Sequence, residues 1–433
     1  MWETQSLHRG SAKENSTFRN ESGSRVQSLN AKSWMEARMH KKRLFSVIAA
    51  TSAAALILSG CGGSSSSSSG VPKVDMMKSL GKGEGQVNIV AWAGYVENGS
   101  TDPKVDWVTD FEKSTGCKVN VKNGATSDDM VALMKTGEYD VVSASGDASL
   151  RLIYGGDVAP VNTKLIPNYA DIFDNLKMQP WNSVDGVAYG VPHGRGANLL
   201  AYRTDIVKPA PTSWGAVFDV NSPYKGKITA YDSPIYIADA ALYLMKTKPE
   251  LGIKYPYALD QKQFDASVEL LKAQKPLIGE YWGDYLKHVA SLKSGATVLG
   301  TTWQVNINLA QGEKTKVEGI KPSEGSTGWS DTWMISSKAK HPNCAYQWMN
   351  HIVSPAANAG VAEWFGEAPS NAKSCDLTAD KNHCATFHAS DDAYWKDVYY
   401  WNTPTEKCLD GRKDAKCIPY AEWVKAWSSL RNA

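Results

Sequence analysis

Short apolar segments alternate with amphipathic segments from residue 86 onward. Continuous or alternating apolar positions predict strands over 87–92, 117–121 and 139–143. Between them, apolar residues recur at helical spacing over 105–114, before Gly116, and over 127–134, where Ser127 and Asp128 are candidate helix caps. This alternation of strand and helix predicts an α/β layer with a mostly parallel sheet.

The pattern changes near residue 189, where the chain leaves the first layer. Further strands are predicted over 199–202, 227–231 and 297–303, and helices over 238–245, 261–273 and 282–294. A strand over 331–336 and a helix over 344–352 then return to the first lobe. About 370 residues are many for one core, so we expect two α/β lobes joined by hinge crossovers.

These observations divide the chain into consecutive parts. We expect the last part to be a Trp- and Tyr-rich, disulfide-bearing extension that wraps onto the lobes. The predicted parts are a leader with a signal peptide (1–60), a Gly/Ser- and Lys-rich flexible tether (61–84), lobe 1 (85–191), lobe 2 (192–322), the second part of lobe 1 (323–372) and the C-terminal extension (373–433).

The N-terminal region has the order of a bacterial export signal. Basic residues at 41–43 precede an apolar run over 44–58, and Cys61 follows small residues and precedes a serine tract. The run of 15 residues is shorter than the ~20 that a membrane-spanning helix needs. The segment resembles bacterial lipoprotein signals, which implies lipidation at Cys61; an uncleaved anchor or a buried helix is the alternative.

Export changes the charge of the mature protein. Residues 1–60 hold nine Lys and Arg against four Asp and Glu, so the formal charge falls from +2 for the whole chain to −3 for the remainder. With no basic tail left, we expect no nucleic-acid partner.

The cysteine count agrees with an oxidising compartment. Seven cysteines leave six after Cys61, an even number that suits three disulfides. The close pairs Cys375–Cys384 and Cys408–Cys417 favour local bridges, which leaves Cys117–Cys344. Spacing alone allows 15 connectivities. A metal cluster is the alternative, but C-x-x-C is absent from the sequence, so we expect no metal.

Linear catalytic signatures are absent from this sequence. It contains neither G-x-S-x-G, H-E-x-x-H nor G-x-x-x-x-G-K-[ST]. We therefore expect no enzymatic activity and no cofactor, with an exported hydrolase as the less favoured alternative.

Aromatic and acidic residues instead gather where the predicted strands end. Ends of strands that face a crevice are where open α/β sheets bind ligands, and aromatic faces with carboxylates attract ammonium groups. For any single Trp, core packing is the simpler interpretation. The residues at these places are Trp92, Tyr95, Tyr231, Asp232, Trp303, Trp329 and Asp331.

Several segments together resemble one family. They include AWAGYV (91–96), YDVVSASGDASLRLI (139–153), AYDSPIYIADAALYL (230–244), GTTWQVN (300–306) and EGSTGWSDTWMI (324–335). The chain resembles the polyamine-type (spermidine/putrescine) extracellular solute-binding proteins of ABC importers, over about 87–371. The resemblance implies a type II-like periplasmic-binding-protein fold, whose two lobes close on a ligand about a hinge.

The resemblance also implies a set of ligand-binding positions. Trp92 and Tyr95 match pocket residues, Trp303 and Trp329 match the walls around an alkyl chain, and Asp232 and Asp331 match amine anchors. Ser145 falls where the family has a serine–tyrosine pair, although the tyrosine is missing here, and Glu367 replaces an expected tyrosine.

Two further departures bear on the ligand. Ile235 replaces an expected glutamate, and Arg195 stands just after the crossover, where it enters the cleft or forms a salt bridge at the hinge. The ligand is therefore as well expected to be a diamine, or an amine that carries a carboxylate such as aminobutyrate, as to be spermidine. On the same fold, an amino acid, a sugar or iron is the alternative ligand.

The resemblance completes the functional expectation. It implies a monomeric receptor that binds a small cationic amine between its lobes and delivers it to ABC permease subunits. Its lipid anchor would hold it at the outer face of the cell membrane.

Overall fold

The computed structural model describes residues 70–432. The predicted signal segment, Cys61 and the first part of the predicted tether lie outside the described residues. None of the described helices is long and apolar enough to cross a membrane.

The first sheet contains the strands on both sides of the crossover. Its order is β13-β6-β12-β3-β1-β2, and β14 pairs with β12. Pairs β1–β2, β1–β3 and β12–β14 are parallel, whereas β12–β3, β12–β6 and β13–β6 are antiparallel. The strands are β1 (Gln86–Ala91), β2 (Lys118–Asn123), β3 (Val141–Ala144), β6 (Val191–Ala197), β12 (Ser326–Ile335), β13 (Ala368–Pro369) and β14 (Val398–Tyr400).

The second sheet has the order β11-β7-β10-β8-β9, in which β8 is parallel to β9 and β10, while β7 is antiparallel to β10 and β11. A separate two-stranded sheet joins β4 and β5. These strands are β4 (Ser183–Val184), β5 (Val187–Ala188), β7 (Leu199–Arg203), β8 (Ile228–Tyr231), β9 (Ile278–Trp282), β10 (Leu299–Thr302) and β11 (Val317–Ile320).

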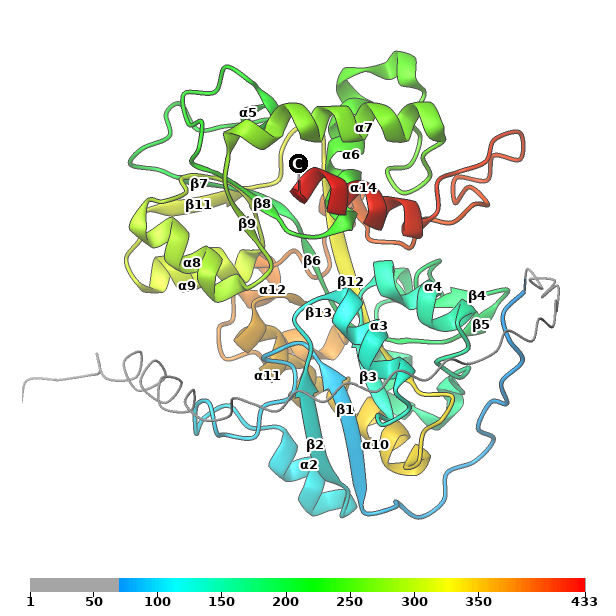
Figure 1. Cartoon of the computed structure of the whole chain (residues 1–433). Helices are drawn as coiled ribbons and strands as arrows, with labels where there is room; N and C mark the ends of the chain where they lie inside the picture. The colour runs from blue at the N-terminus through cyan, green and yellow to red at the C-terminus, as the bar shows by residue number, and fades with distance from the viewer. Residues whose placement is uncertain (1–69, 433) are drawn as a thin grey trace, which may run out of the picture. The chain divides into compact units, whose positions relative to one another are not determined.

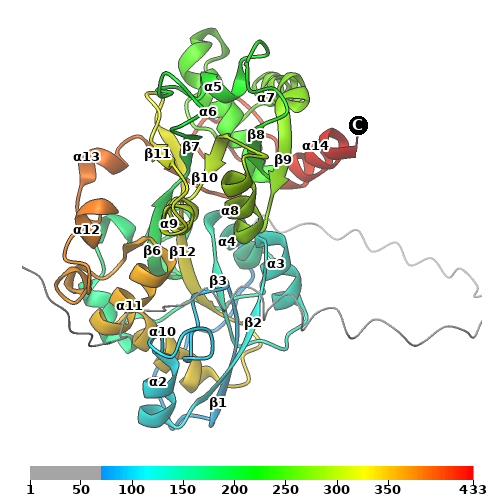
Figure 2. The same cartoon turned by 90° about the vertical axis from the view of Figure 1, so that its left-hand side faces the viewer.

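Helices accompany both sheets, as Figures 1 and 2 show. The α-helices are α2 (Val108–Thr115), α3 (Ser127–Lys135), α4 (Gly146–Tyr154), α5 (Gly215–Phe218), α6 (Ile237–Thr247), α7 (Gln261–Gln274), α8 (Tyr285–Ser294), α9 (Gln304–Gly312), α10 (Pro342–Ile352), α11 (Pro355–Phe365), α12 (His383–Thr386), α13 (Asp392–Trp395) and α14 (Tyr420–Asn432). Short 3₁₀ turns are η1 (Thr163–Leu165), η2 (Pro167–Asp171), η3 (Asp174–Leu176), η4 (Pro234–Tyr236), η5 (Pro249–Leu251), η6 (Lys275–Leu277) and η7 (Ala372–Asp376).

The structure corrects three local predictions. The first sheet is mixed rather than mostly parallel, because β12, β13 and β14 run opposite to β1, β2, β3 and β6. The segment 278–282 is strand β9 beside β8, so the predicted helix over 282–294 begins only at Tyr285. The cap of α3 is Thr126, whose side chain accepts a hydrogen bond from the Asp129 N–H.

The two sheets form two α/β lobes within the described unit, and the long strand β12 links them. Its C-terminal half pairs with β3 of the first lobe. Near its N-terminal end, Thr327 donates a hydrogen bond to Asp239 on α6 of the second lobe. The predicted α/β class with a disulfide-bearing C-terminal extension is confirmed. The predicted lobe boundaries stay predictions; the one at 191/192 falls on the first residues of β6.

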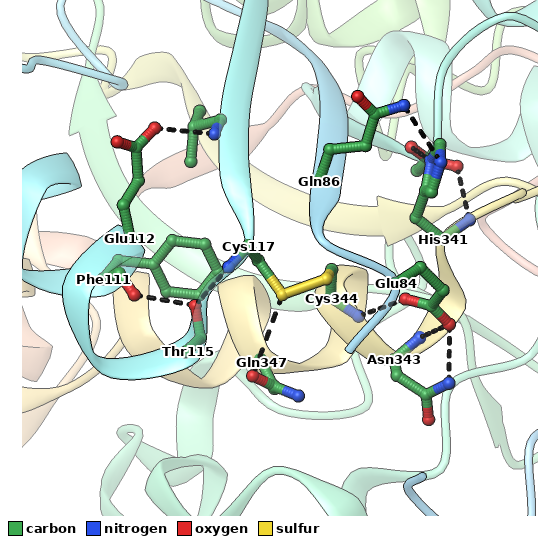
Figure 3. The surroundings of a disulfide bond; sticks show 12 residues. Glu84, Gln86, Phe111, Glu112, Thr115, Cys117, His341, Asn343, Cys344 and Gln347 are labelled. Atoms are coloured by element: carbon green, nitrogen blue, oxygen red, sulfur yellow. Dashed lines mark hydrogen bonds and ion pairs between the residues drawn. A yellow bond between two sulfur atoms is a disulfide. The ribbon is translucent and has the colours of Figure 1, made fainter. Parts of the chain in front are cut away.

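Three disulfides join the pairs Cys117–Cys344, Cys375–Cys384 and Cys408–Cys417. The first connects the residue before β2 to α10, as Figure 3 shows. Beside it, the Glu84 carboxylate accepts hydrogen bonds from the Asn343 and Cys344 N–H groups. A carboxylate at a helix N-terminus satisfies free amide groups, so residue 84 is held against the first lobe.

Candidate ligand-binding site

Two buried carboxylates share one tyrosine hydroxyl in the first lobe. The Tyr95 hydroxyl lies 2.9 Å from Asp331 Oδ2 and 3.2 Å from Glu367 Oε2. The Ser145 hydroxyl donates to Asp331 Oδ1 at 2.5 Å. A tyrosine has a single hydroxyl proton, so it donates to one carboxylate at a time. We call Tyr95, Ser145, Asp331 and Glu367 the acidic cluster.

The fold brings the acidic cluster together from distant segments. Tyr95 follows β1, and Ser145 follows the parallel neighbour β3 and is the N-cap residue of α4. Asp331 lies in β12, beside β3. Glu367 follows α11, which ends at Gly366 with a φ of 81°. The carboxyl ends of β1 and β3 thus form the edge at which the cluster lies.

A glycine allows Glu367 to approach the sheet. Gly194 of β6 is directly paired with Asp331. A Cβ atom at Gly194 would lie 2.6 Å from the Glu367 carboxyl carbon. Only a residue without a side chain fits between them.

Burial sets the charge state of the cluster. Asp331 is 3% exposed and Glu367 is fully buried. Burial raises the pKa of Asp331 to about 7; the Ser145 hydrogen bond opposes this rise and the charge of Glu367 adds to it. Burial also raises the pKa of Tyr95 well above its ordinary value, and the two carboxylates act in the same direction.

His193 is the internal partner of Glu367. Trp333 Nε1 donates to His193 Nδ1 at 2.9 Å, so in the neutral ring the proton lies on Nε2. His193 Nε2 is 3.2 Å from Glu367 Oε1. Among residues 70–432, neither Asp331 nor Glu367 forms an ion pair with a lysine or arginine.

Aromatic rings extend from the acidic cluster toward the second lobe. Phe365 packs edge-on to Tyr95, with ring centroids 4.8 Å apart, and to Trp329 at 5.9 Å. Trp329 in turn lies 6.5 Å from Trp303, which follows β10. Trp303 is 5.4 Å from Tyr231 at the end of β8. The structure thus brings Tyr95, Trp329 and Trp303 into one continuous aromatic wall.

Asp232 does not belong to the acidic cluster. Its carboxylate is paired with a cationic side chain of the protein itself. Arg431 Nε and Nη2 donate to its two carboxylate oxygens at 3.0 and 3.2 Å. Trp427 Nε1 donates to Asp232 Oδ1 at 3.2 Å. Both donors lie on α14, so the C-terminal extension occupies this predicted anchor.

Arg195 is buried and also bound by the C-terminal extension. Its guanidinium donates to the Tyr400 hydroxyl at 3.1 Å and to the Ala389 carbonyl at 2.7 Å. The same group lies 4.3 Å from the Trp395 ring centroid. Its partners are a hydroxyl, a carbonyl and a ring, and no carboxylate pairs with it among residues 70–432, so the salt bridge expected at the hinge is not formed. Its role in ligand binding stays a prediction. The remaining predicted residue, Trp92, is half-buried and packs on the first-lobe cores.

The C-terminal extension contributes a residue that the sequence did not indicate. The Trp401 ring stacks on Tyr231 at 5.5 Å, and the backbone N–H of Trp401 donates to the carbonyl of Gly328, next to Trp329. Thr403, two residues on, donates to the Asp147 carbonyl on α4. Trp401, His193 and Phe365 are the site residues that sequence reasoning missed; the abundance of Trp and Tyr in the extension was the one available signal.

A two-lobe α/β fold with an acidic and aromatic site beside its crossover strands defines a receptor for a small solute. The chain belongs to the family of bacterial extracellular solute-binding proteins, whose model matches residues 106–386. The extracellular family agrees with the predicted export, and it is not a class of enzymes.

Individual relatives and solved structures are similar to this chain at low identity. The chain is 25% identical over 286 residues to spermidine/putrescine-binding periplasmic protein 1 of Haemophilus influenzae, covering 65% of this chain and 74% of the relative. It is 24% identical over 279 residues to the spermidine/putrescine-binding periplasmic protein of Escherichia coli, covering 64% and 74%. The solved spermidine/putrescine ABC transporter substrate-binding protein PotD of Streptococcus pneumoniae has a TM-score of 0.61 at 19% identity, covering 80% of this chain and 97% of that one. The predicted periplasmic-binding-protein fold is confirmed.

Proposed function

We propose that this protein binds a small organic amine at the acidic cluster and delivers it to the permease of an ABC importer. The observation that carries the proposal is the pair of buried carboxylates, Asp331 and Glu367, which share Tyr95. Burying a carboxylate charge that no lysine or arginine neutralises is costly, so such a pair favours an incoming cation. The names of the relatives support an amine as that cation.

The neighbouring rings suit the rest of such a ligand. Trp329 and Trp303 offer aromatic faces next to the cluster, and one cation–π contact contributes about 0.5–2 kcal/mol. An alkyl chain attached to the ammonium group would pack on the same rings. Closure of the lobes would then select the ligand through contacts to both of them.

The proposal also covers the location of the receptor and the absence of a chemical reaction. Lipid attachment at Cys61 would hold it beside the permease, and its role requires no chemical change of the ligand. Mass spectrometry of the released ligand checks this point, because a receptor returns the amine unaltered, whereas a hydrolase returns a product.

Calorimetric titration tests the binding site. The panel is butylamine, putrescine, cadaverine, spermidine, 4-aminobutyrate and common amino acids. We expect at least one amine to bind and Asp331→Asn to weaken its binding at least tenfold, because the variant removes the charge that faces the ammonium group.

The matched control is Asp239→Asn. Asp239 is also a buried aspartate that accepts a hydroxyl hydrogen bond, but it lies on α6 of the second lobe. We expect its amine affinity to stay within about threefold of the unmodified protein. Equal losses in both variants, or no amine binding at all, would refute the proposed site.

A further inference from the structure

The C-terminal extension contacts both lobes through α14. Figures 1 and 2 show this helix in red, next to α4 of the first lobe and the helices of the second. Its first residue, Tyr420, lies under the Arg151 guanidinium of α4 at 4.6 Å. On the second lobe, Trp423 packs on Phe264 and Lys275 donates to the Leu430 carbonyl.

The end of α14 places a cation where a ligand cation would be held. Arg431 makes a two-point contact with the Asp232 carboxylate, and its guanidinium lies 3.9 Å from the Tyr281 ring centroid. A carboxylate and an aromatic face around one cation is the arrangement by which proteins bind ammonium ligands. At Asp232, the cation comes from the chain itself.

Asp232 lies on the same edge as the aromatic wall. It follows β8, and Trp303 follows β10, which is the parallel neighbour of β8. The preceding residue, Tyr231, contacts both Trp303 and Trp401. A ligand packed on these rings would therefore extend from the acidic cluster toward Asp232.

Asp232 and the acidic cluster differ in whether a basic side chain pairs with them. The Asp232 carboxylate is paired with Arg431, whereas Asp331 and Glu367 are not paired with a lysine or arginine among residues 70–432. We infer that Arg431 substitutes for a second ligand ammonium group, so the receptor prefers ligands with one ammonium group over diamines. This inference rests on the proposed function, because it assigns the ligand class of the same site.

A comparison of paired ligands tests the inference. Butylamine and putrescine share a four-carbon chain and differ by one ammonium group, and pentylamine and cadaverine form a second pair. In the unmodified protein we expect each monoamine to bind more tightly than its diamine. Arg431→Gln should raise diamine affinity at least tenfold and change monoamine affinity less than threefold, because Asp232 then lacks a cation.

Two variants provide controls. Arg431→Lys keeps the cation and should keep the unmodified preference. Arg412→Gln breaks the ion pairs of another arginine of the C-terminal extension, with Asp260 and Asp410, and should leave the ratio unchanged. Melting temperatures show whether each variant is folded.

The possible failures are distinct. A diamine that binds as tightly as its monoamine, or more tightly, in the unmodified protein overturns the inference without any variant. An unchanged ratio in folded Arg431→Gln does the same, and in both cases amine binding itself stands. If none of these four ligands binds but another amine of the calorimetric panel does, the inference falls and the proposed function stands. Absence of binding by every amine tested, to every variant, overturns both together.

Discussion

At the scale of single residues, buried carboxyl groups determine how this protein responds to pH. Burial raises the pKa of Asp147 to about 6, and those of Asp239 and Asp331 to about 7. Each folded group keeps its proton in a range where the unfolded chain, with an ordinary pKa near 3.9, has lost it. These groups therefore lower the stability of the ligand-free protein as pH rises from about 4 to 7.

Asp239 allows this effect to be measured away from the acidic cluster. Asp239→Asn has no charge at any pH and keeps the acceptor for Thr327. Relative to the unmodified protein, it should gain roughly 1–3 kcal/mol in the free energy of unfolding between pH 4.5 and 7.5. Urea unfolding followed by tryptophan fluorescence measures both proteins at each pH.

The difference between the two proteins is the informative quantity, because other groups titrate as well. Burial lowers the pKa of His288 to about 3, which acts in the opposite direction, but it does so equally in both proteins. Parallel stability curves over this pH range would show that Asp239 is ionised in the folded state throughout.

At the scale of elements, local sequence patterns predict most strands and helices but not the partners of charged side chains. The apolar runs at β1, β7 and β8 and the helical spacing at α6 and α7 match the structure within a few residues. The segment of β9 differs because its aromatic residues also fit a helical pattern, and only pairing with β8 selects the strand.

The same distinction between local patterns and long-range contacts explains which site residues could be predicted from the sequence. Strand ends indicated Tyr95 and Trp303, because a strand end is a local signal. Trp329 and Asp331, in contrast, lie inside β12 rather than at the start of the predicted strand over 331–336, because pairing with β6 extends that strand. The partner of Asp232 is 199 residues away on α14, and no local pattern specifies that contact. Its predicted ligand role therefore stays a prediction.

The disulfide Cys117–Cys344 gives a test at this scale. It joins cysteines 227 residues apart, whereas Cys408–Cys417 joins cysteines nine apart. In the chain-entropy account, a longer closed loop restricts the unfolded chain more strongly. Replacing Cys117 and Cys344 with alanine should cost about 3–5 kcal/mol, against roughly 2–3 kcal/mol for the Cys408/Cys417 pair.

Urea unfolding of both double variants under non-reducing conditions measures these costs. Both pairs are buried, so side-chain burial is comparable. An equal or smaller loss for the Cys117/Cys344 variant would contradict the entropic argument. It would indicate that the first lobe is already restricted in the unfolded state.

At the scale of the whole described unit, β12 and the C-terminal extension connect the lobes. Thr327 of β12 binds Asp239, and Asn198 bonds both Thr327 and the Trp303 indole. This hydrogen-bonded chain links the crossover region to the aromatic wall. These hydrogen bonds join the two lobes, whereas the acidic cluster supplies the charge that the ligand meets.

The central claim is that an ammonium group binds next to an Asp331 carboxyl that is partly protonated in the free receptor. Its most direct test is titration of the amine found by the ligand panel, in buffers of different ionisation enthalpy and at several pH values. The ligand ammonium keeps its proton, whereas Asp331, with a pKa of about 7, loses one on binding. The account predicts release of roughly half a proton per amine at pH 7, and an affinity that rises about tenfold from pH 6 to pH 8. Equal binding enthalpies in all buffers, with an affinity that does not change over this range, would contradict it.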